Sequence, residues 1–416
     1  MASAPARRTV RPRTTTEQAL AYQSKRRCPL GLCLMLLVVG ALVVPTIAAA
    51  QTAAVIHSFG QQKGDGVGPE GSLIASPRGN FYGTTTDGGT VSNGTIFKVS
   101  LNRRGGWNET VLYRFRGGAD GSQPNAASLL MDSAGHLYGT TFFGGANNVG
   151  VAFELRRVAG HWQESVLYNF GSYPGDGAKP INALIMDAQG NLFGVTAFGG
   201  SAGTGSVFEL SPGSDGWAER VIYSDEASAA ALTMDAAGNL FGTTAIGVFE
   251  LSPDGSGAWT SKILHSFGAT PVYPQGTLVL DHAGNLYGTT YQGGAKKYGS
   301  VYRLSPALHG NWIYRTLYSF QGYPVDGQNP FAGLVFDSAG NLYGTTFIGG
   351  KYNGGTVFEL VAVGSGTYKK KILWNFNGSN GEQILGGLIL DRSGNLYGTS
   401  FYGGAVQAGA IFEVIP

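Results

Sequence analysis

The sequence predicts an all-β protein, a seven-bladed β-propeller with four antiparallel strands in each blade. A motif close to Gly-Asn-Leu-Tyr-Gly-Thr recurs, and its copies begin at Gly79, Gly135, Gly190, Gly238, Gly284, Gly340 and Gly394. A unit that repeats every 46 to 56 residues needs its neighbours to bury its apolar surface. The 67 glycines among 416 residues favour many short strands joined by tight turns.

The sixth copy shows the expected unit most clearly. Its four apolar runs, each of strand length, are residues 333–337, 341–346, 356–360 and 371–376. The first two runs are joined by Asp-x-x-Gly-Asn, a type I turn signal in which the aspartate side chain can accept the turn amides. Links this short cannot hold a crossover helix, so the strands are expected to form an antiparallel meander.

The two ends of the chain indicate how the ring closes. The last copy stops after its third strand, at residues 410–415, with no fourth strand behind it. An unmatched strand at residues 54–59 opens the repeat region and closely matches residues 262–267. We therefore expect residues 54–59 to join the seventh blade as its outer strand, which leaves no unpaired terminal edge.

Residues 1–50 are interpreted as a signal peptide, and residues 51–416 as the propeller. Residues 1–27 carry seven Lys/Arg against one acid, Glu17, and residues 29–50 carry no charge. This uncharged run ends in small residues, at 46–50, so residues 1–50 have the layout of a secretory signal that is cleaved after Ala49 or Ala50. The alternative is a retained anchor helix, and only then would the protein be held at a membrane. Either way we expect export, to the cell surface, the periplasm or the medium.

Without residues 1–50 the chain has 21 basic and 25 acidic residues, a net charge of −4. A mildly acidic body lacks the basic surface that nucleic acid requires, so no nucleic-acid partner is expected. Both cysteines, Cys28 and Cys33, precede residue 51, which excludes disulfide and thiolate chemistry from the repeat region.

The repeats resemble the GloVer tandem-repeat family, which is found in secreted bacterial proteins. The resemblance rests on Gly-Asn-Leu-Tyr-Gly-Thr-Thr, Phe-x-Gly-Gly and Gly-Thr-Val-Phe-Glu-Leu, as at residues 340–360, and covers residues 53–416. The resemblance implies that the protein is exported, and it implies no particular reaction because none is assigned to the family. A looser resemblance links Asp-x-x-Gly-Asn-Leu-Tyr to lactonase-like and streptogramin-lyase-like propellers. Their strands continue to an acidic residue where this chain has Gly-Thr-Thr, and hydroxyls cannot replace anionic ligands of a catalytic cation.

Candidate ligand-binding residues lie in the loops of one face of the ring. Four loops between successive blades share Asp-Gly-x-x-Pro, and their aspartates are Asp65, Asp120, Asp176 and Asp326. One interpretation is a rim of carboxylates that recognises a cation or a hydroxyl-rich glycan. The alternative is that Asp-Gly simply forms turns.

The fourth copy lacks two of the loops that the other copies have. Its link between the second and third strands shrinks to residues 245–247, and the preceding link, residues 225–229, has lost the Asp-Gly-x-x-Pro insert. We hypothesise a notch in the rim, flanked by Phe198 and Tyr291, through which an extended polymer reaches the central channel. The alternative is drift in a surface loop.

Aromatic residues mark the hairpins of the opposite face. They are Trp107, Trp162, Trp217, Trp259 and Trp312, with Tyr368 in the sixth copy. Such rings could stack on sugars, but we favour packing, with each ring clamping its hairpin to its own blade.

The sequence predicts no catalytic residue, no metal site and no cofactor. The six histidines have no metal-ligand spacing, and neither a nucleophile elbow nor a phosphate-binding loop occurs. We therefore expect a monomeric binding or scaffold module for a glycan or an envelope protein. The alternative is a polysaccharide hydrolase or lyase that uses a pair of loop carboxylates.

Overall fold

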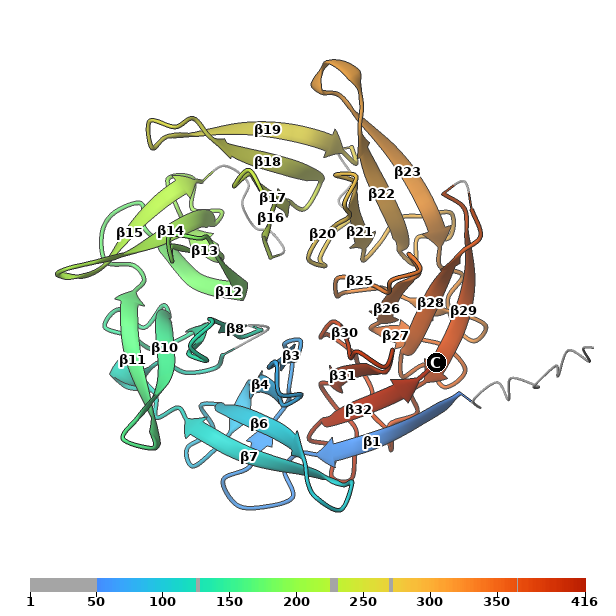
Figure 1. Ribbon diagram of the computed structural model, residues 1–416, viewed down its shortest axis with the longest axis horizontal. Helices are drawn as coiled ribbons and strands as arrows, with labels where there is room; N and C mark the ends of the chain where they lie inside the picture. Colours follow the sequence, from blue (N-terminus) through green and yellow to red (C-terminus); the bar gives the residue numbers. More distant parts are fainter. Residues whose placement is uncertain (1–50, 125–127, 225–230, 269–271, 365) are drawn as a thin grey trace, which may run out of the picture. The chain divides into compact units, whose positions relative to one another are not determined.

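The computed structural model describes residues 51–124, 128–224, 231–268, 272–364 and 366–416. These residues form a ring of seven four-stranded antiparallel sheets (Figure 1). Each sheet is a blade, numbered in chain order, and its strands run from the innermost to the outermost. The predicted fold class is therefore confirmed. Within this part of the chain, no helix is long and apolar enough to cross a bilayer.

The first three blades follow the order expected from the repeats. Blade 1 consists of β3 (Ile74–Ala75), β4 (Phe81–Thr85), β6 (Thr95–Leu101) and β7 (Trp107–Arg114). Blade 2 consists of β8 (Leu130–Met131), β9 (Leu137–Thr141), β10 (Val151–Val158) and β11 (His161–Asn169). Blade 3 consists of β12 (Gly177–Met186), β13 (Leu192–Gly199), β14 (Ser206–Gly213) and β15 (Gly216–Tyr223).

The next three blades keep the same order. Blade 4 consists of β16 (Thr233–Met234), β17 (Leu240–Thr243), β18 (Gly247–Pro253) and β19 (Trp259–Ser266). Blade 5 consists of β20 (Val279–Leu280), β21 (Leu286–Thr290), β22 (Ser300–Pro306) and β23 (Trp312–Ser319). Blade 6 consists of β25 (Val335–Phe336), β26 (Leu342–Thr346), β28 (Thr356–Ala362) and β29 (Tyr368–Asn375), so its outer strand begins three residues before the predicted position.

Blade 7 is assembled from both ends of the repeat region. It consists of β30 (Ile389–Leu390), β31 (Leu396–Ser400), β32 (Ala410–Ile415) and β1 (Thr52–Ser58), which lies beside β32 in Figure 1. The antiparallel register pairs Ala54 with Glu413 and Ser58 with Ala410. The predicted closure by the N-terminal strand is confirmed.

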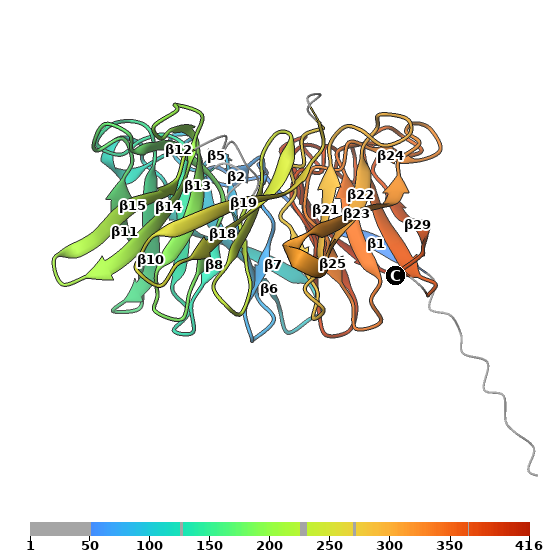
Figure 2. The same ribbon diagram turned by 90° about the horizontal axis from the view of Figure 1, so that it is seen from above.

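Short elements mark the loops at one face of the ring. This loop face carries the links from each outer strand to the next blade and the links between second and third strands. Its two-stranded ladders are β2 (Gly66–Val67) with β5 (Asp87–Gly88), and β24 (Gly327–Gln328) with β27 (Ile348–Gly349). Figure 2 shows the labels of β2, β5 and β24 along the upper edge of the ring. Among the described residues, the 3₁₀ turns are η1 (Gly118–Asp120) in a loop of this face and η2 (Leu308–Gly310) in the β22–β23 hairpin of the opposite face.

An aromatic ring on the third strand lies against a glycine of the second strand in every blade. A Cβ added to Gly344 would lie 2.6 Å from Phe358, and the equivalent distance for Gly398 and Phe412 is 2.5 Å. The ring also meets an aromatic side chain at the end of the preceding blade's outer strand. The seven pairs, with centroids 4.9–5.4 Å apart, are Phe59–Phe97, Phe115–Phe153, Phe170–Phe208, Tyr223–Phe249, Phe267–Tyr302, Phe320–Phe358 and Phe376–Phe412.

The two threonines of Gly-Thr-Thr have different partners. The first bonds to the next blade: Thr289 Oγ1 donates to the buried carbonyl of Ala332 at 3.0 Å, and Thr399 Oγ1 donates to Gly71 at 3.0 Å. The second bonds within its blade, as Thr346 Oγ1 does with Thr356 Oγ1 at 2.9 Å. The motif therefore links blades to one another as well as the strands of one blade.

The hairpin tryptophans pack, as predicted, but their partners lie mainly in the preceding blade. Trp217 of blade 3 lies 6.5 Å from Tyr138 of blade 2, and Trp312 of blade 5 lies 6.2 Å from Phe241 of blade 4. Trp107 contacts both its own blade and blade 7. The aromatic clamp therefore acts between blades, because the apolar surface that a sheet must bury is the face toward its neighbour.

We expect the Thr289→Val substitution to destabilise the protein by about 1 to 2 kcal/mol, because the buried Ala332 carbonyl loses its donor. Thr140→Val is the matched control, since Thr140 Oγ1 is buried without a partner and blade 3 has Val195 at this position. The control should be neutral. Urea unfolding of both variants measures the difference, and equal stabilities would contradict the inter-blade role of the threonine.

Candidate functional site

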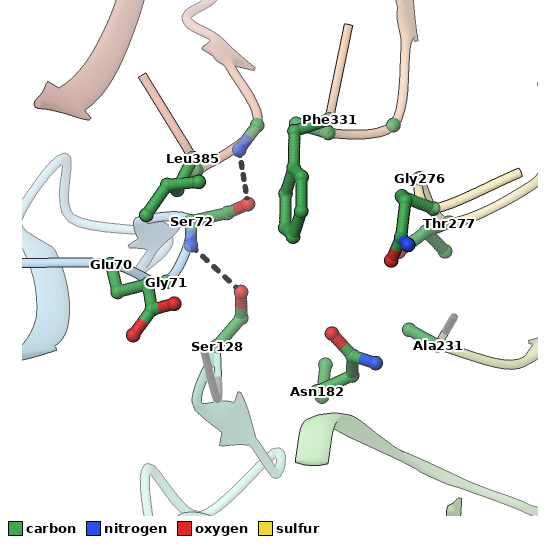
Figure 3. A pocket seen from close by; sticks show the side chains of 16 residues that line it. Glu70, Gly71, Ser72, Ser128, Asn182, Ala231, Gly276, Thr277, Phe331 and Leu385 are labelled. Carbon is green, nitrogen blue, oxygen red and sulfur yellow. Dashed lines mark hydrogen bonds between the residues drawn. The ribbon is translucent and has the colours of Figure 1, made fainter. Parts of the chain in front are cut away.

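The central opening on the loop face is lined by residues that precede the inner strand of each blade, except in blade 3, where Asn182 and Ala183 lie within β12. All seven blades contribute, and the side chains are mostly small or polar (Figure 3). The Ser72 amide donates to Ser128 Oγ at 2.9 Å, and the Gly387 amide donates to Ser72 Oγ at 2.7 Å. The cavity at this mouth measures about 50 Å³, which suits a few water molecules rather than a sugar ring.

A larger aromatic hollow adjoins this opening on blades 5, 6 and 7. It measures about 280 Å³, and Tyr291 lies at its centre, with ring centroids 6.2 Å from Phe331 and 6.5 Å from Phe347. The complete lining is Tyr273, Gln275, Tyr291, Gln292, Phe331, Phe347 and Leu385. Figure 3 shows the Phe331 ring pointing into the central opening, so the two cavities share a wall.

The short loop of blade 4 meets this hollow. Only residues 244–246 separate β17 from β18, and the Ala245 carbonyl accepts a hydrogen bond from the Tyr273 amide at 3.3 Å. Tyr273 has a φ of 48°, a left-handed conformation that is uncommon for a bulky residue. The other deletion predicted for this blade, at residues 225–229, lies outside the described residues.

The two aromatic residues predicted to flank the notch lie in separate groups. Tyr291 belongs to the hollow, whereas Phe198 is 51% exposed on blade 3. The ammonium group of Lys179 lies 5.3 Å from the Phe198 ring, and also contacts the rings of Phe142 and Phe143 at 5.0 and 4.8 Å. Their role in ligand binding stays a prediction.

The four loop aspartates lie at the outer side of the ring. We call the contact between the outer strands of neighbouring blades a seam. At three seams the aspartate accepts a hydrogen bond from a tyrosine hydroxyl of the outer strand: Asp120 from Tyr113, Asp176 from Tyr168 and Asp326 from Tyr318. Asp65 instead accepts the amides of Gln61 and Gly66. These contacts hold the loops in place, and a ligand-binding role for Asp65, Asp120, Asp176 and Asp326 stays a prediction.

Each of these aspartates faces a charged residue of the next outer strand. The facing residues are Glu109, Glu164 and Glu219 opposite Asp65, Asp120 and Asp176, and Lys370 opposite Asp326. Burial is the main cause that raises the pKa of each glutamate to about 7, and the charge of the neighbouring aspartate contributes to this rise. At the first seam burial also lowers the pKa of His57, which occupies the tyrosine position.

The sequence prediction missed both the seam partners and the wall of the hollow. Glu109, Glu164 and Glu219 each stand two residues after a hairpin tryptophan, and this regularity was the available signal. Tyr291 and Phe347 both occupy the first position of the repeated Phe-x-Gly-Gly motif, which was the available signal for the hollow, whereas Gln275 and Phe331 come from loops of different sequence. Only the ring brings them together.

The sequence profile of the Gloeobacter/Verrucomicrobia repeat matches residues 103–248 and 245–416. The chain belongs to this repeat family. The family resemblance predicted from the motifs is thus confirmed. No curated protein matches the sequence.

Solved structures similar to this Gloeobacter/Verrucomicrobia repeat protein are also propellers. Virginiamycin B lyase from Staphylococcus aureus has a TM-score of 0.55 at 12% identity, over 88% of this chain and 99% of that chain. A streptogramin B lyase structure has a TM-score of 0.56 at 13% identity, over 88% and 97% of the two chains. Similarity at this level of identity shows a shared fold alone.

The raised glutamate pKa values predict a pH dependence of stability. The folded protein keeps these protons up to about pH 7, whereas an unfolded glutamate loses its proton near its ordinary value of 4.5. The folded state therefore binds more protons between these values, and stability should fall as the pH rises from about 5 to 8.

The Glu164→Gln/Glu219→Gln double variant isolates this effect from the opposite contribution of His57. The groups that face the two glutamates are Asp120 and Arg116 at Glu164, and Asp176 and Tyr173 at Glu219, and the double variant leaves them unchanged. In chelator-treated buffer the melting temperature of the wild type should drop relative to the variant as the pH rises. Parallel pH profiles would contradict the assignment.

Proposed function

We propose that this repeat protein is an exported binding module whose loop face recognises a carbohydrate through the aromatic hollow. The observation that supports the proposal is the composition of the hollow, which combines four aromatic rings with the amides of Gln275 and Gln292. Aromatic faces suit the C–H surfaces of sugar rings, and side-chain amides can both donate to and accept from hydroxyls. Pockets of this kind, apolar with a few convergent polar groups, are typical ligand sites.

The location of the carboxylates favours binding over catalysis at this place. A hydrolase or lyase would need two carboxylates in the cleft that holds the substrate. Among the described residues, those that line the hollow include no carboxylate, and Glu70 is the one carboxylate that lines the central opening. The aspartate–glutamate pairs lie instead at the seams, and the seam position repeats around the ring as a structural feature would.

The alternative function, a polysaccharide hydrolase or lyase, retains one supporting observation. His57, Asp65 and Glu109 border a separate outer cavity of about 500 Å³. A reducing-sugar assay and an assay for unsaturated products on the same glycans separate the two functions. Turnover that is lost in Glu109→Gln but kept in Tyr291→Ala would favour the enzyme.

Tyr291→Ala and Phe347→Ala should each weaken glycan binding about tenfold or more, because each removes one wall of the hollow; tenfold corresponds to about 1.4 kcal/mol. Glycans identified on an array are titrated by calorimetry. Tyr352→Ala is the matched control, since Tyr352 is 52% exposed on a loop of blade 6 and does not line the hollow. Wild-type affinity in both hollow variants would refute the proposal.

Export is supported by the basic and then apolar layout of residues 1–50, which lie outside the described residues. We expect a secreted or surface form that begins at Ala50 or Gln51, because the small residues before these positions suit signal cleavage. Cell fractionation followed by N-terminal sequencing tests this. Recovery of the uncleaved chain in the membrane fraction would favour the retained anchor.

A further inference from the structure

The seam between blades 5 and 6 shows how a buried loop aspartate is neutralised. Asp326 is 2% exposed and forms an ion pair with Lys370 on the outer strand of blade 6. Its second oxygen accepts the Tyr318 hydroxyl at 2.7 Å. A cation thus occupies this seam, as expected, because a buried carboxylate needs a compensating charge.

Two other seams have the same aspartate and tyrosine but a glutamate in place of the lysine. Asp176 is 4% exposed, and its Oδ2 accepts the Tyr168 hydroxyl at 2.8 Å while its Oδ1 is buried without a partner. Glu219 Oε1 and Glu164 Oε1 are likewise buried and unpartnered among the described residues. Lys370 binds the Oδ1 oxygen of Asp326, so the equivalent oxygen of Asp176 is directed to the place where a cation sits in the other seam.

The seam between blades 7 and 1 differs by one residue that changes its chemistry. His57 of β1 replaces the tyrosine, and it lies beside Asp65 of the following loop and Glu109 of β7. One ligand atom from each of the three side chains lies within 4.8 Å of the others. In the part of the chain that the structure describes, His57 Nε2 and Glu109 Oε1 are both buried without a hydrogen-bond partner. An imidazole nitrogen and two carboxylates thus converge with unused lone pairs.

We propose that His57, Asp65 and Glu109 bind one divalent transition-metal ion such as Zn²⁺. A nitrogen with two carboxylate oxygens is a ligand set that Zn²⁺ accepts, whereas Ca²⁺ requires six or more oxygens. The ion would balance the two carboxylates as Lys370 balances Asp326. Three protein ligands leave a position for water, which reaches the site from the outer cavity.

The neighbouring basic residues leave room for the ion. Arg114 lies near Glu109, but its Nε donates to the Gly64 carbonyl at 2.8 Å. Lys63 lines the same cavity and has no ion pair with the three ligands.

The ion would connect the strand that closes the ring to the next blade. His57 lies on β1, which is held in blade 7 by its pairing with β32, while Glu109 lies on the outer strand of blade 1. A metal that binds the folded protein better than the unfolded chain raises its stability. We therefore expect Zn²⁺ to stabilise the ring specifically through this seam.

Calorimetric titration of the purified, tag-free, chelator-treated protein with ZnCl₂ tests the proposal. We expect one bound equivalent and a rise in melting temperature. His57→Tyr recreates the side chain that three other seams carry, so it should fold normally while its Zn²⁺ affinity falls tenfold or more. Glu109→Gln should show the same loss. Absence of Zn²⁺ binding by the wild type, or wild-type affinity in both variants, would overturn the proposal.

Two controls use the repeats themselves. His265 occupies the equivalent strand position in blade 4, but its ring stacks on Tyr314 at 4.3 Å, so His265→Tyr should bind Zn²⁺ like the wild type. Tyr168→His places a histidine beside Asp176 and Glu219 and should add a second equivalent. Loss of Zn²⁺ binding in His265→Tyr would overturn the assignment of His57 as a ligand. If Tyr168→His still bound a single equivalent of Zn²⁺, a histidine with two such carboxylates would not be enough to form the site.

Discussion

The contact between a strand glycine and an aromatic ring sets the geometry of the whole molecule. In each blade the ring from the third strand lies so close to the second strand that a Cβ there would approach it to about 2.5 Å. This position brings the ring to the aromatic side chain that ends the preceding outer strand. The same contact therefore fixes the packing inside a blade and the packing between blades. Phe59, just after β1, supplies the aromatic partner of Phe97, so ring closure depends on the N-terminal segment for packing as well as for strand pairing.

Polar groups also join neighbouring blades, and the kind of polar group differs between the centre of the ring and its outer side. Near the axis, threonine hydroxyls such as those of Thr289 and Thr399 bond to carbonyls of the next blade. At the rim, loop aspartates bond to outer-strand tyrosines and face charged residues of the next blade. Buried polar groups require partners, and most seams supply them from within the chain. The exceptions at the described seams include the unpartnered oxygens of Glu109, Glu164 and Glu219, and these occur where a carboxylate replaces the lysine of the seam between blades 5 and 6.

The loop face and the seams carry different kinds of side chain. Aromatic and amide side chains gather beside the central opening, partly in loops that vary and partly, as for Tyr291 and Phe347, at the Phe-x-Gly-Gly position of the repeat. Carboxylates gather at the outer seams, in positions that follow it. The residues of the hollow are not among the seven aromatic pairs or the threonine bonds between blades, so a binding surface here can change without loss of those contacts. The similarity to the lyase structures, at 12% and 13% identity, shows a shared fold alone.

The sequence by itself determined the number of blades, the antiparallel order and the closing strand. These features depend on local patterns, namely the spacing of Gly-Asn-Leu-Tyr-Gly-Thr, the Asp-x-x-Gly-Asn turn and the unmatched strand at residues 54–59. It also placed aspartates and tryptophans in the correct loops and hairpins. Only the tertiary structure decided what these side chains contact: Trp217 packs on the preceding blade, and Asp65 meets Glu109, 44 positions later in the chain. The reason is physical, since strand pairing repeats within one copy, whereas the seams and the hollow join side chains from different copies whose mutual distance only the closed ring defines.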